Sequence, residues 1–251
     1  MDRLRDMGFS ETEISFALEA VGGNAEAAVE LLLETSPRLV SSDATSIVLD
    51  ISQYLFSQVD TSACTTIACS ALPQLLESLD ENQLLNKEKL SAMLIEGIEH
   101  HRHVTSVLGL EHVSVEEVVE LLPSLTSSLS SINITSQRSL TSPDCFEKLV
   151  QEAIDSCPDI NRHIGVIVTK PPETVALIIN PAPTGRQLLF DSHSRPQLGL
   201  EGAYLLSSDL MGIVSHLKQL FPAPYGQNTQ SMSLMEEMYY SFEANAYQRK
   251  N

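Results

Sequence analysis

Residues 189–196 read Leu-Phe-Asp-Ser-His-Ser-Arg-Pro and join an apolar run to a group of polar side chains. The β-rich residues 187–193 predict a strand that ends in this group. Because side chains alternate between the two faces of a strand, Asp191 and His193 lie on the same face. A carboxylate placed there holds one tautomer of the imidazole and favours its protonated form. The stretch therefore predicts a catalytic base, His193, oriented by Asp191.

Two more β-rich runs, 163–169 and 174–180, precede this strand, and the Lys-Pro-Pro-Glu between them predicts a hairpin. Apolar residues at helical spacing predict helices that begin near Cys64 and near Asp144, and others over 87–103, 115–122 and 208–221. Helices followed by a block of strands are typical of an α+β fold. We expect a domain over residues 45–225 in which a helical part packs on a small antiparallel β-sheet.

Other segments are less regular. Residues 47–55 are apolar and fit either a strand or the first turns of a helix. Residues 124–142 hold eleven Ser and Thr in nineteen positions and predict a mobile loop. Asp144 and Glu147 match the pattern of a capping box. The Met-rich residues 232–247 favour a helix, so a helical tail is expected over 226–251.

Cys64 has the features of a nucleophile. The small residues Ser62 and Ala63 precede it and leave room for a substrate backbone. A helix that begins here stabilises a thiolate through its dipole and its unpaired amides. Cys69 lies deeper in the same helix among apolar neighbours and is expected in the core.

A thiol protease also needs a hydrogen-bond donor for the oxyanion. Two upstream glutamines are candidates: Gln58 lies six residues before Cys64, and Gln53 lies eleven before it. We favour Gln58 because six is the papain-type spacing, but the residues leave the choice open. The backbone amide of Cys64 is a candidate donor in either case.

The first 36 residues predict three short helices. Ser10 and Glu13 form a capping box at the start of the second helix. Gly22 and Gly23 end that helix, and Asn24 caps the third.

Residues 1–38 resemble a ubiquitin-associated (UBA) domain. The features that carry this resemblance are Met-Gly-Phe at 7–9, the capped helix and Gly-Gly-Asn-Ala-Glu-Ala-Ala at 22–28. In that family the Met-Gly-Phe turn and the end of the third helix form an apolar patch that binds ubiquitin. By position, the resemblance implicates Met7, Gly8, Phe9, Leu32 and Leu33. The alternative is that Met7 and Phe9 merely cover the small core, but an exposed Met-Phe pair beside a glycine turn favours a partner.

Three further segments carry a second resemblance: Ser-Ala-Cys-Thr-Thr-Ile-Ala at 62–68, the strand pair at 163–180 and the stretch at 189–196. Over about residues 45–222 the chain resembles the herpesvirus tegument-type deubiquitinases, a branch of the papain-like cysteine proteases. The resemblance implies a triad in which Cys64 is the nucleophile, His193 the base and Asp191 its partner. Neither Gln53 nor Gln58 lies at the separation expected for the family's upstream glutamine.

Composition narrows the classes of partner. The chain has 15 Lys and Arg against 33 Asp and Glu, a net charge of −18. Without a compact basic cluster, this argues against nucleic acid and an anionic membrane as partners. No apolar run is long enough to span a bilayer. Scattered cysteines without a Cys-x-x-Cys pair predict a reduced compartment, cytoplasmic or nuclear.

We expect neither a metal nor a cofactor, because the chemistry of a cysteine protease needs none. His100, His101 and His103 share a polar helix end with Arg102, where a metal site is the less favoured interpretation. The features together predict a ubiquitin-specific cysteine protease that hydrolyses peptide and isopeptide bonds after the C-terminal glycine of ubiquitin. Its partners would be ubiquitin or polyubiquitin chains. Two alternatives stay open: a catalytically inactive ubiquitin-binding scaffold, and a protease for another ubiquitin-like modifier.

Overall fold

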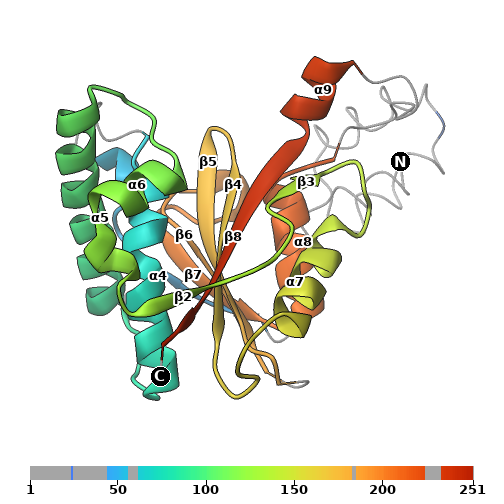
Figure 1. The fold of residues 1–251 in the computed structure, drawn as a ribbon, viewed down its shortest axis with the longest axis horizontal. Helices are drawn as coiled ribbons and strands as arrows, with labels where there is room; N and C mark the ends of the chain where they lie inside the picture. The colour runs from blue at the N-terminus through green and yellow to red at the C-terminus, as the bar shows by residue number, and fades with distance from the viewer. Residues whose placement is uncertain (1–23, 25–43, 56–61, 183–184, 224–232, 251) are drawn as a thin grey trace. The chain divides into compact units, whose positions relative to one another are not determined.

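A computed structural model describes residues 24, 44–55, 62–182, 185–223 and 233–250 of the chain (Figure 1). The chain divides into two units, Met1–Val40 and Ser41–Asn251. Apart from Asn24, every described residue belongs to the second unit. The UBA prediction and its residues Met7, Gly8, Phe9, Leu32 and Leu33 lie outside the described residues, so they stay predictions, as do the domain boundaries at 38 and 45.

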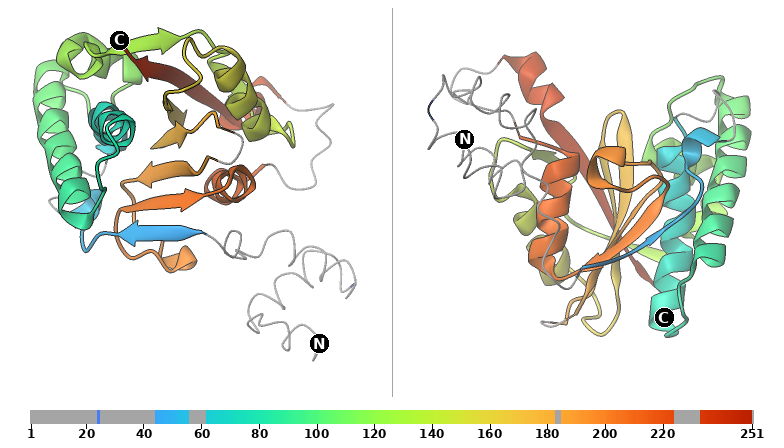
Figure 2. Two further views of the ribbon diagram at one scale, coloured as in Figure 1. Left: turned by 90° about the horizontal axis from the view of Figure 1, so that it is seen from below. Right: turned by 180° about the vertical axis from the view of Figure 1, so that it is seen from behind.

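One antiparallel sheet forms the centre of the second unit (Figure 2). Its strands follow the order β1-β7-β6-β5-β4-β8-β2, and β3 also pairs with β8. The strands are β1 Thr45–Val48, β2 Leu129–Ile132, β3 Gln137–Ser139, β4 Ile164–Lys170, β5 Glu173–Ile179, β6 Gln187–Asp191, β7 Tyr204–Ser208 and β8 Ser241–Arg249. The apolar strands β4 and β5 form the predicted hairpin, with Lys170 opposite Glu173 at its tip.

Helices cover both faces of this sheet (Figures 1 and 2). On one side lie α4 Cys64–Asp80, α5 Lys87–Leu108 and α6 Val115–Leu121, and on the other lie α7 Cys145–Asp155 and α8 Leu210–Leu220. The shorter elements are η1 Gln53–Leu55, η3 Pro123–Thr126, η4 Pro196–Leu198 and α9 Leu234–Tyr239. No helix in the described part of the chain is long and apolar enough to cross a membrane.

Helix α4 is buried between α5 and the sheet, and two glycines permit its close packing. A Cβ on Gly165 of β4 would lie 2.6 Å from Leu72 Cδ1, and one on Gly97 of α5 would lie 2.6 Å from Ile67 Cα. Such distances are far inside van der Waals contact, so a side chain at either position would push α4 away. Because α4 begins with Cys64, these contacts fix the position of the thiol.

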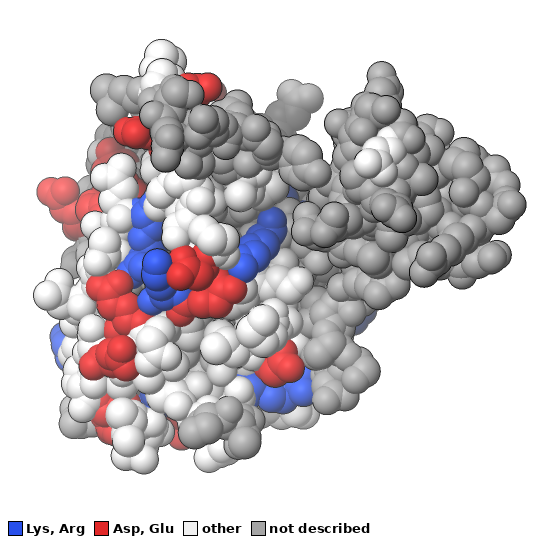
Figure 3. Space-filling model, turned by 90° about the vertical axis from the view of Figure 1, so that its right-hand side faces the viewer, with Lys and Arg blue, Asp and Glu red and all other residues white. Residues whose placement is uncertain are grey.

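Charged side chains on the side of α7 and α8 alternate in sign (Figure 3). Lys218 Nζ lies 2.7 Å from Glu147 Oε1, and Lys148 Nζ lies 3.0 Å from Asp144 Oδ2. The described residues of this face therefore form no continuous basic surface of the kind that binds a nucleic-acid backbone.

The α+β class is confirmed, but the sheet is larger than expected. The helix predicted over 232–247 is confined to α9, because Ser241–Arg249 is strand β8. The expected helical tail is thus wrong in this part: β8 pairs with β4 on one side and with β2 and β3 on the other.

Two further local predictions are wrong. The segment 124–142, expected as a mobile loop, contains η3, β2 and β3. Asp144 is the N-cap of α7, but its side chain makes no capping hydrogen bond and accepts one from Ser142 Oγ at 2.6 Å. In the ambiguous segment 47–55, the strand β1 ends at Val48 and the 3-10 helix η1 occupies Gln53–Leu55.

Candidate active site

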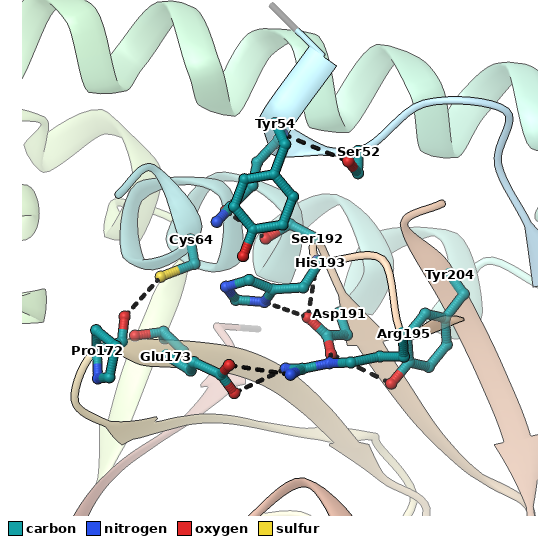
Figure 4. Close-up of polar contacts among 12 residues, drawn as sticks. Ser52, Tyr54, Cys64, Pro172, Glu173, Asp191, Ser192, His193, Arg195 and Tyr204 are labelled. Atoms are coloured by element: carbon teal, nitrogen blue, oxygen red, sulfur yellow. Dashed lines mark hydrogen bonds and ion pairs between the residues drawn. The ribbon is translucent and has the colours of Figure 1, made fainter. Parts of the chain in front are cut away.

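Cys64 is the first residue of α4, and its side chain faces the tip of the β4–β5 hairpin (Figure 4). The thiol donates a hydrogen bond to the carbonyl oxygen of Pro172, with 3.4 Å between sulfur and oxygen. The next residue, Thr65, shares a hydrogen bond of 2.9 Å with Thr174. Two contacts therefore fix the start of α4 against the hairpin. Cys64 is 2% exposed, so the thiol is almost fully covered.

Asp191 and His193 lie together at the end of β6, as the alternation predicts. The Nδ1 atom of His193 lies 2.6 Å from Asp191 Oδ1, and the backbone amide of His193 donates to the same oxygen at 2.9 Å. Asp191 is fully buried and His193 is 3% exposed. The carboxylate thus fixes both the orientation and the tautomer of the ring.

The imidazole of His193 lies between Cys64 and Asp191 (Figure 4). Burial lowers the pKa of His193, but hydrogen bonds with Asp191 and Cys64 and the charges of both groups raise it, to about 9. Burial raises the pKa of Asp191, but the hydrogen bond and charge of His193 and the charge of Arg195 outweigh burial and lower it. Both shifts favour an imidazolium beside a carboxylate anion.

The second oxygen of Asp191 has its own partners. Arg195 Nε donates to Asp191 Oδ2 at 2.9 Å, and the hydroxyl of Tyr204 donates to it at 3.2 Å. Tyr204 also shares a hydrogen bond of 2.7 Å with His216 Nε2. Burial lowers the pKa of His216 to about 4, so this second imidazole is neutral near pH 7. Each oxygen of the buried Asp191 carboxylate therefore has two hydrogen-bond partners, and these fix its orientation.

Of the two glutamines predicted as oxyanion donors, the structure describes Gln53. Gln58 lies outside the described residues. Gln53 is fully buried; its Oε1 accepts a hydrogen bond of 2.9 Å from Ser192 Oγ, and its backbone amide donates to the Ser192 carbonyl at 3.1 Å. Its neighbour Tyr54 lies 5.8 Å from the His193 ring, measured between ring centroids. Gln53 is therefore anchored beside the base.

A cavity of about 640 Å³ lies beside the start of α4. Ser62, Thr65 and Pro172 line the cavity, and so do Phe242 and Glu243 of β8. Two of these residues, Thr65 and Pro172, also make the contacts that hold the Cys64 segment.

Cys69, His100 and His101 lie in structural environments. Burial raises the pKa of Cys69 to about 12, which fits its expected place in the core. His101 is buried against Thr66, and His100 bonds to Ser70 Oγ at 2.8 Å. Within the described residues, no group of three or more His, Cys, Asp or Glu side chains could hold a metal ion.

Sequence reasoning missed Glu173, Arg195 and Tyr204. Arg195 stands four residues after Asp191 in the stretch quoted at the outset, but its partner Glu173 comes from another strand. No local spacing relates these two residues, so only the fold brings them together.

No protein-family model matches the sequence, and no curated protein matches it. Among solved structures, the fold is similar to that of the ubiquitin-specific protease encoded by murine cytomegalovirus tegument protein M48, solved in complex with a ubiquitin-based suicide substrate. The TM-score is 0.58 at 13% sequence identity, over 82% of this chain and 88% of that one. The fold implied by the tegument-type resemblance is therefore confirmed at the level of architecture.

Proposed function

We propose that this chain is a cysteine protease that cleaves peptide and isopeptide bonds after the C-terminal glycine of ubiquitin. The observation that carries the proposal is the position of the His193 ring, which lies between the Cys64 thiol and the buried Asp191 that holds its Nδ1 atom (Figure 4). These groups come from a helix and a strand far apart in the sequence, and their order is the one a thiol nucleophile requires. The similarity to a ubiquitin-specific protease supports the choice of substrate.

In the proposed reaction, the Cys64 thiolate attacks the carbonyl carbon of the terminal glycine. The tetrahedral intermediate collapses when the carbon–nitrogen bond breaks, and the His193 imidazolium gives its proton to the leaving amine. The neutral imidazole then takes a proton from water as the water attacks the thioester. The thiolate leaves, the imidazolium is restored, and the ubiquitin carboxylate is released.

In this proposal the side chain of Gln53 and the backbone amide of Cys64 donate hydrogen bonds to the oxyanion. The buried side chain of Gln53 is held by the residue that precedes His193, so a donor there would move with the base. Gln58 stays a prediction outside the described residues. Removing one such donor typically costs about 10²-fold in kcat.

The N-terminal residues 1–38 enter the proposal as a UBA module that binds ubiquitin through Met7, Gly8, Phe9, Leu32 and Leu33. A cytoplasmic or nuclear site of action, where thiols stay reduced, suits the thiol chemistry. Both elements rest on the sequence alone.

Hydrolysis of ubiquitin with a fluorogenic C-terminal amide, and of diubiquitin, tests the proposal. We expect turnover by the wild type, none by Cys64→Ala, and wild-type rates for the matched variant Cys69→Ala. Faster turnover of another ubiquitin-like modifier would reassign the substrate. No turnover of any of these substrates by a folded wild type would favour the non-catalytic scaffold.

A further inference from the structure

Three consecutive residues at the tip of the β4–β5 hairpin contact the catalytic segments. The carbonyl of Pro172 accepts from the Cys64 thiol, and Thr174 bonds to Thr65. Glu173, between them, receives two hydrogen bonds from Arg195: Nη1 donates to Oε1 at 3.0 Å, and Nη2 donates to Oε2 at 2.8 Å. The hairpin therefore lies between the segment of the thiol and the segment of the base.

Arg195 is a fixed point on the side of the base. Its Nε donates to Asp191 Oδ2, and its backbone is held in both directions by Leu200, at 2.6 and 3.0 Å. Its side chain is 9% exposed and that of Glu173 is 27% exposed. One guanidinium thus joins the carboxylate that holds His193 to the turn that faces Cys64 (Figure 4).

The energetics favour a geometric role for this pair. Removing charges from water costs about as much as their attraction returns, so a largely buried ion pair adds little net stability. A bidentate arginine–carboxylate pair does fix the relative position of the two groups, because both nitrogens and both oxygens must be aligned.

We propose that Glu173 and Arg195 are positioning residues, whose ion pair holds the hairpin tip against the loop after β6 and so aligns the Cys64 thiol with His193. The inference rests on the proposed function for its catalytic meaning. Glu173 acts through Arg195 and the hairpin and contacts neither of the reacting groups by its side chain.

Glu173→Gln tests this role, because it weakens the pair and leaves Asp191 and Arg195 in place. The chain offers a matched control in the ion pair of Arg138 and Glu152, whose side chains are 9% and 35% exposed. Glu152→Gln makes the same chemical change away from the site. Two rates are measured: hydrolysis of the fluorogenic ubiquitin amide, and modification of Cys64 by iodoacetamide, located by mass spectrometry.

We expect Glu173→Gln to lower kcat about tenfold with KM changed less than twofold, because misplacement of about 1 Å costs up to about 10²-fold. The iodoacetamide rate should fall with kcat, and Glu173→Asp should recover part of both. Glu152→Gln should keep both rates within twofold of the wild type, even if its melting temperature falls as much as that of Glu173→Gln.

Wild-type kcat and iodoacetamide rates in Glu173→Gln would overturn the inference, and so would an equal loss in Glu152→Gln. If the wild type hydrolyses no ubiquitin substrate, the proposed function fails. The iodoacetamide rates of the two variants then decide the positioning role alone. A folded wild type that neither hydrolyses ubiquitin nor reacts at Cys64 would overturn both.

Discussion

Helix α4 has an aspartate–histidine pair near each end, and the two pairs differ in what surrounds them. Near its first residue, His193 Nδ1 lies 2.6 Å from Asp191. Near its last residue, His163 Nδ1 lies 2.9 Å from Asp80 Oδ1. The first pair has side chains 3% and 0% exposed, whereas the second has side chains 21% and 11% exposed. Proximity of an aspartate to a histidine therefore does not by itself mark the proposed catalytic pair.

The difference lies in the other partners of each group. Asp191 Oδ2 is bonded by Arg195 and Tyr204, whereas the buried Asp80 Oδ2 has no hydrogen-bond partner among the described residues. The free side of the His193 ring faces a thiol, at the end of α4 where a helix dipole favours an anion. The proposed catalytic pair therefore differs from the second pair in its fully bonded carboxylate and in the thiol beside its ring.

Loss of the base should give the largest contrast between the two pairs. We expect His193→Ala to lower kcat/KM for a fluorogenic ubiquitin substrate about 10⁴-fold or more, because thiol and base act as one unit. His163→Ala should leave kcat/KM within twofold. A large loss in both variants, with melting temperatures unchanged, would mean that the contrast between the pairs is wrong.

Loss of the carboxylate should have the next largest effect. Asp191→Asn keeps the shape but removes the charge that fixes the tautomer of His193, so we expect kcat to fall about 10²-fold or more. Asp80→Asn, measured in the same assay, should retain kcat within twofold. Wild-type kcat in Asp191→Asn would remove Asp191 from the mechanism.

The pH dependence of kcat/KM tests how Asp191 acts on His193. Because the pKa of His193 is raised to about 9, its imidazolium persists to that pH, and kcat/KM should fall only above it. Asp191→Asn removes a cause of the raised pKa, so the alkaline limb should move down toward the ordinary histidine value of about 6.5. An alkaline limb at the same pH in both proteins would contradict the assignment.

The same shift links His193 to folding. A pKa raised on folding stabilises the native state below about pH 6.5, and this contribution is lost as the pH rises to about 9. Urea unfolding of the wild type should therefore show a fall in the free energy of unfolding over this window. His193→Ala should show a smaller fall, and equal slopes would count against the raised pKa.

The residues of the proposed triad could be singled out from sequence because their signals are local. Small residues before a helix mark Cys64, and alternation along one strand places Asp191 beside His193. Arg195, Glu173 and Tyr204 gave no such signal, because their partners lie on different strands. The carboxylate–histidine pair could be read from sequence, but the residues that hold it could not.

Strand β8 shows why part of the fold was missed. Its buried side chains alternate as Phe242, Ala244, Ala246 and Gln248. Alanine and glutamine favour helices, and the preceding methionines do too. Pairing with β4 and β2 overrides that preference, so the strand is set by tertiary contacts that no local window contains.

The smallest expected effect concerns the stability of the second pair. His163→Gln should change the free energy of unfolding by less than about 1 kcal/mol, because a single hydrogen bond contributes about 1 kcal/mol net and the glutamine amide can replace the donor. Urea titration measures this value. Lys87→Gln, which removes the exposed ion pair of Lys87 with Asp50, serves as a control. A loss of several kcal/mol would show that the second pair is a major support of α4.

The central claim is that Cys64 and His193 act together on the carbonyl at the ubiquitin C-terminus. A ubiquitin probe with an electrophilic C-terminus tests it directly, with the adduct located by mass spectrometry. The account predicts one adduct, on Cys64, that is absent in Cys64→Ala, strongly slowed in His193→Ala and unchanged in His163→Ala. An adduct that persists in Cys64→Ala, or a folded wild type that forms none, would contradict the account.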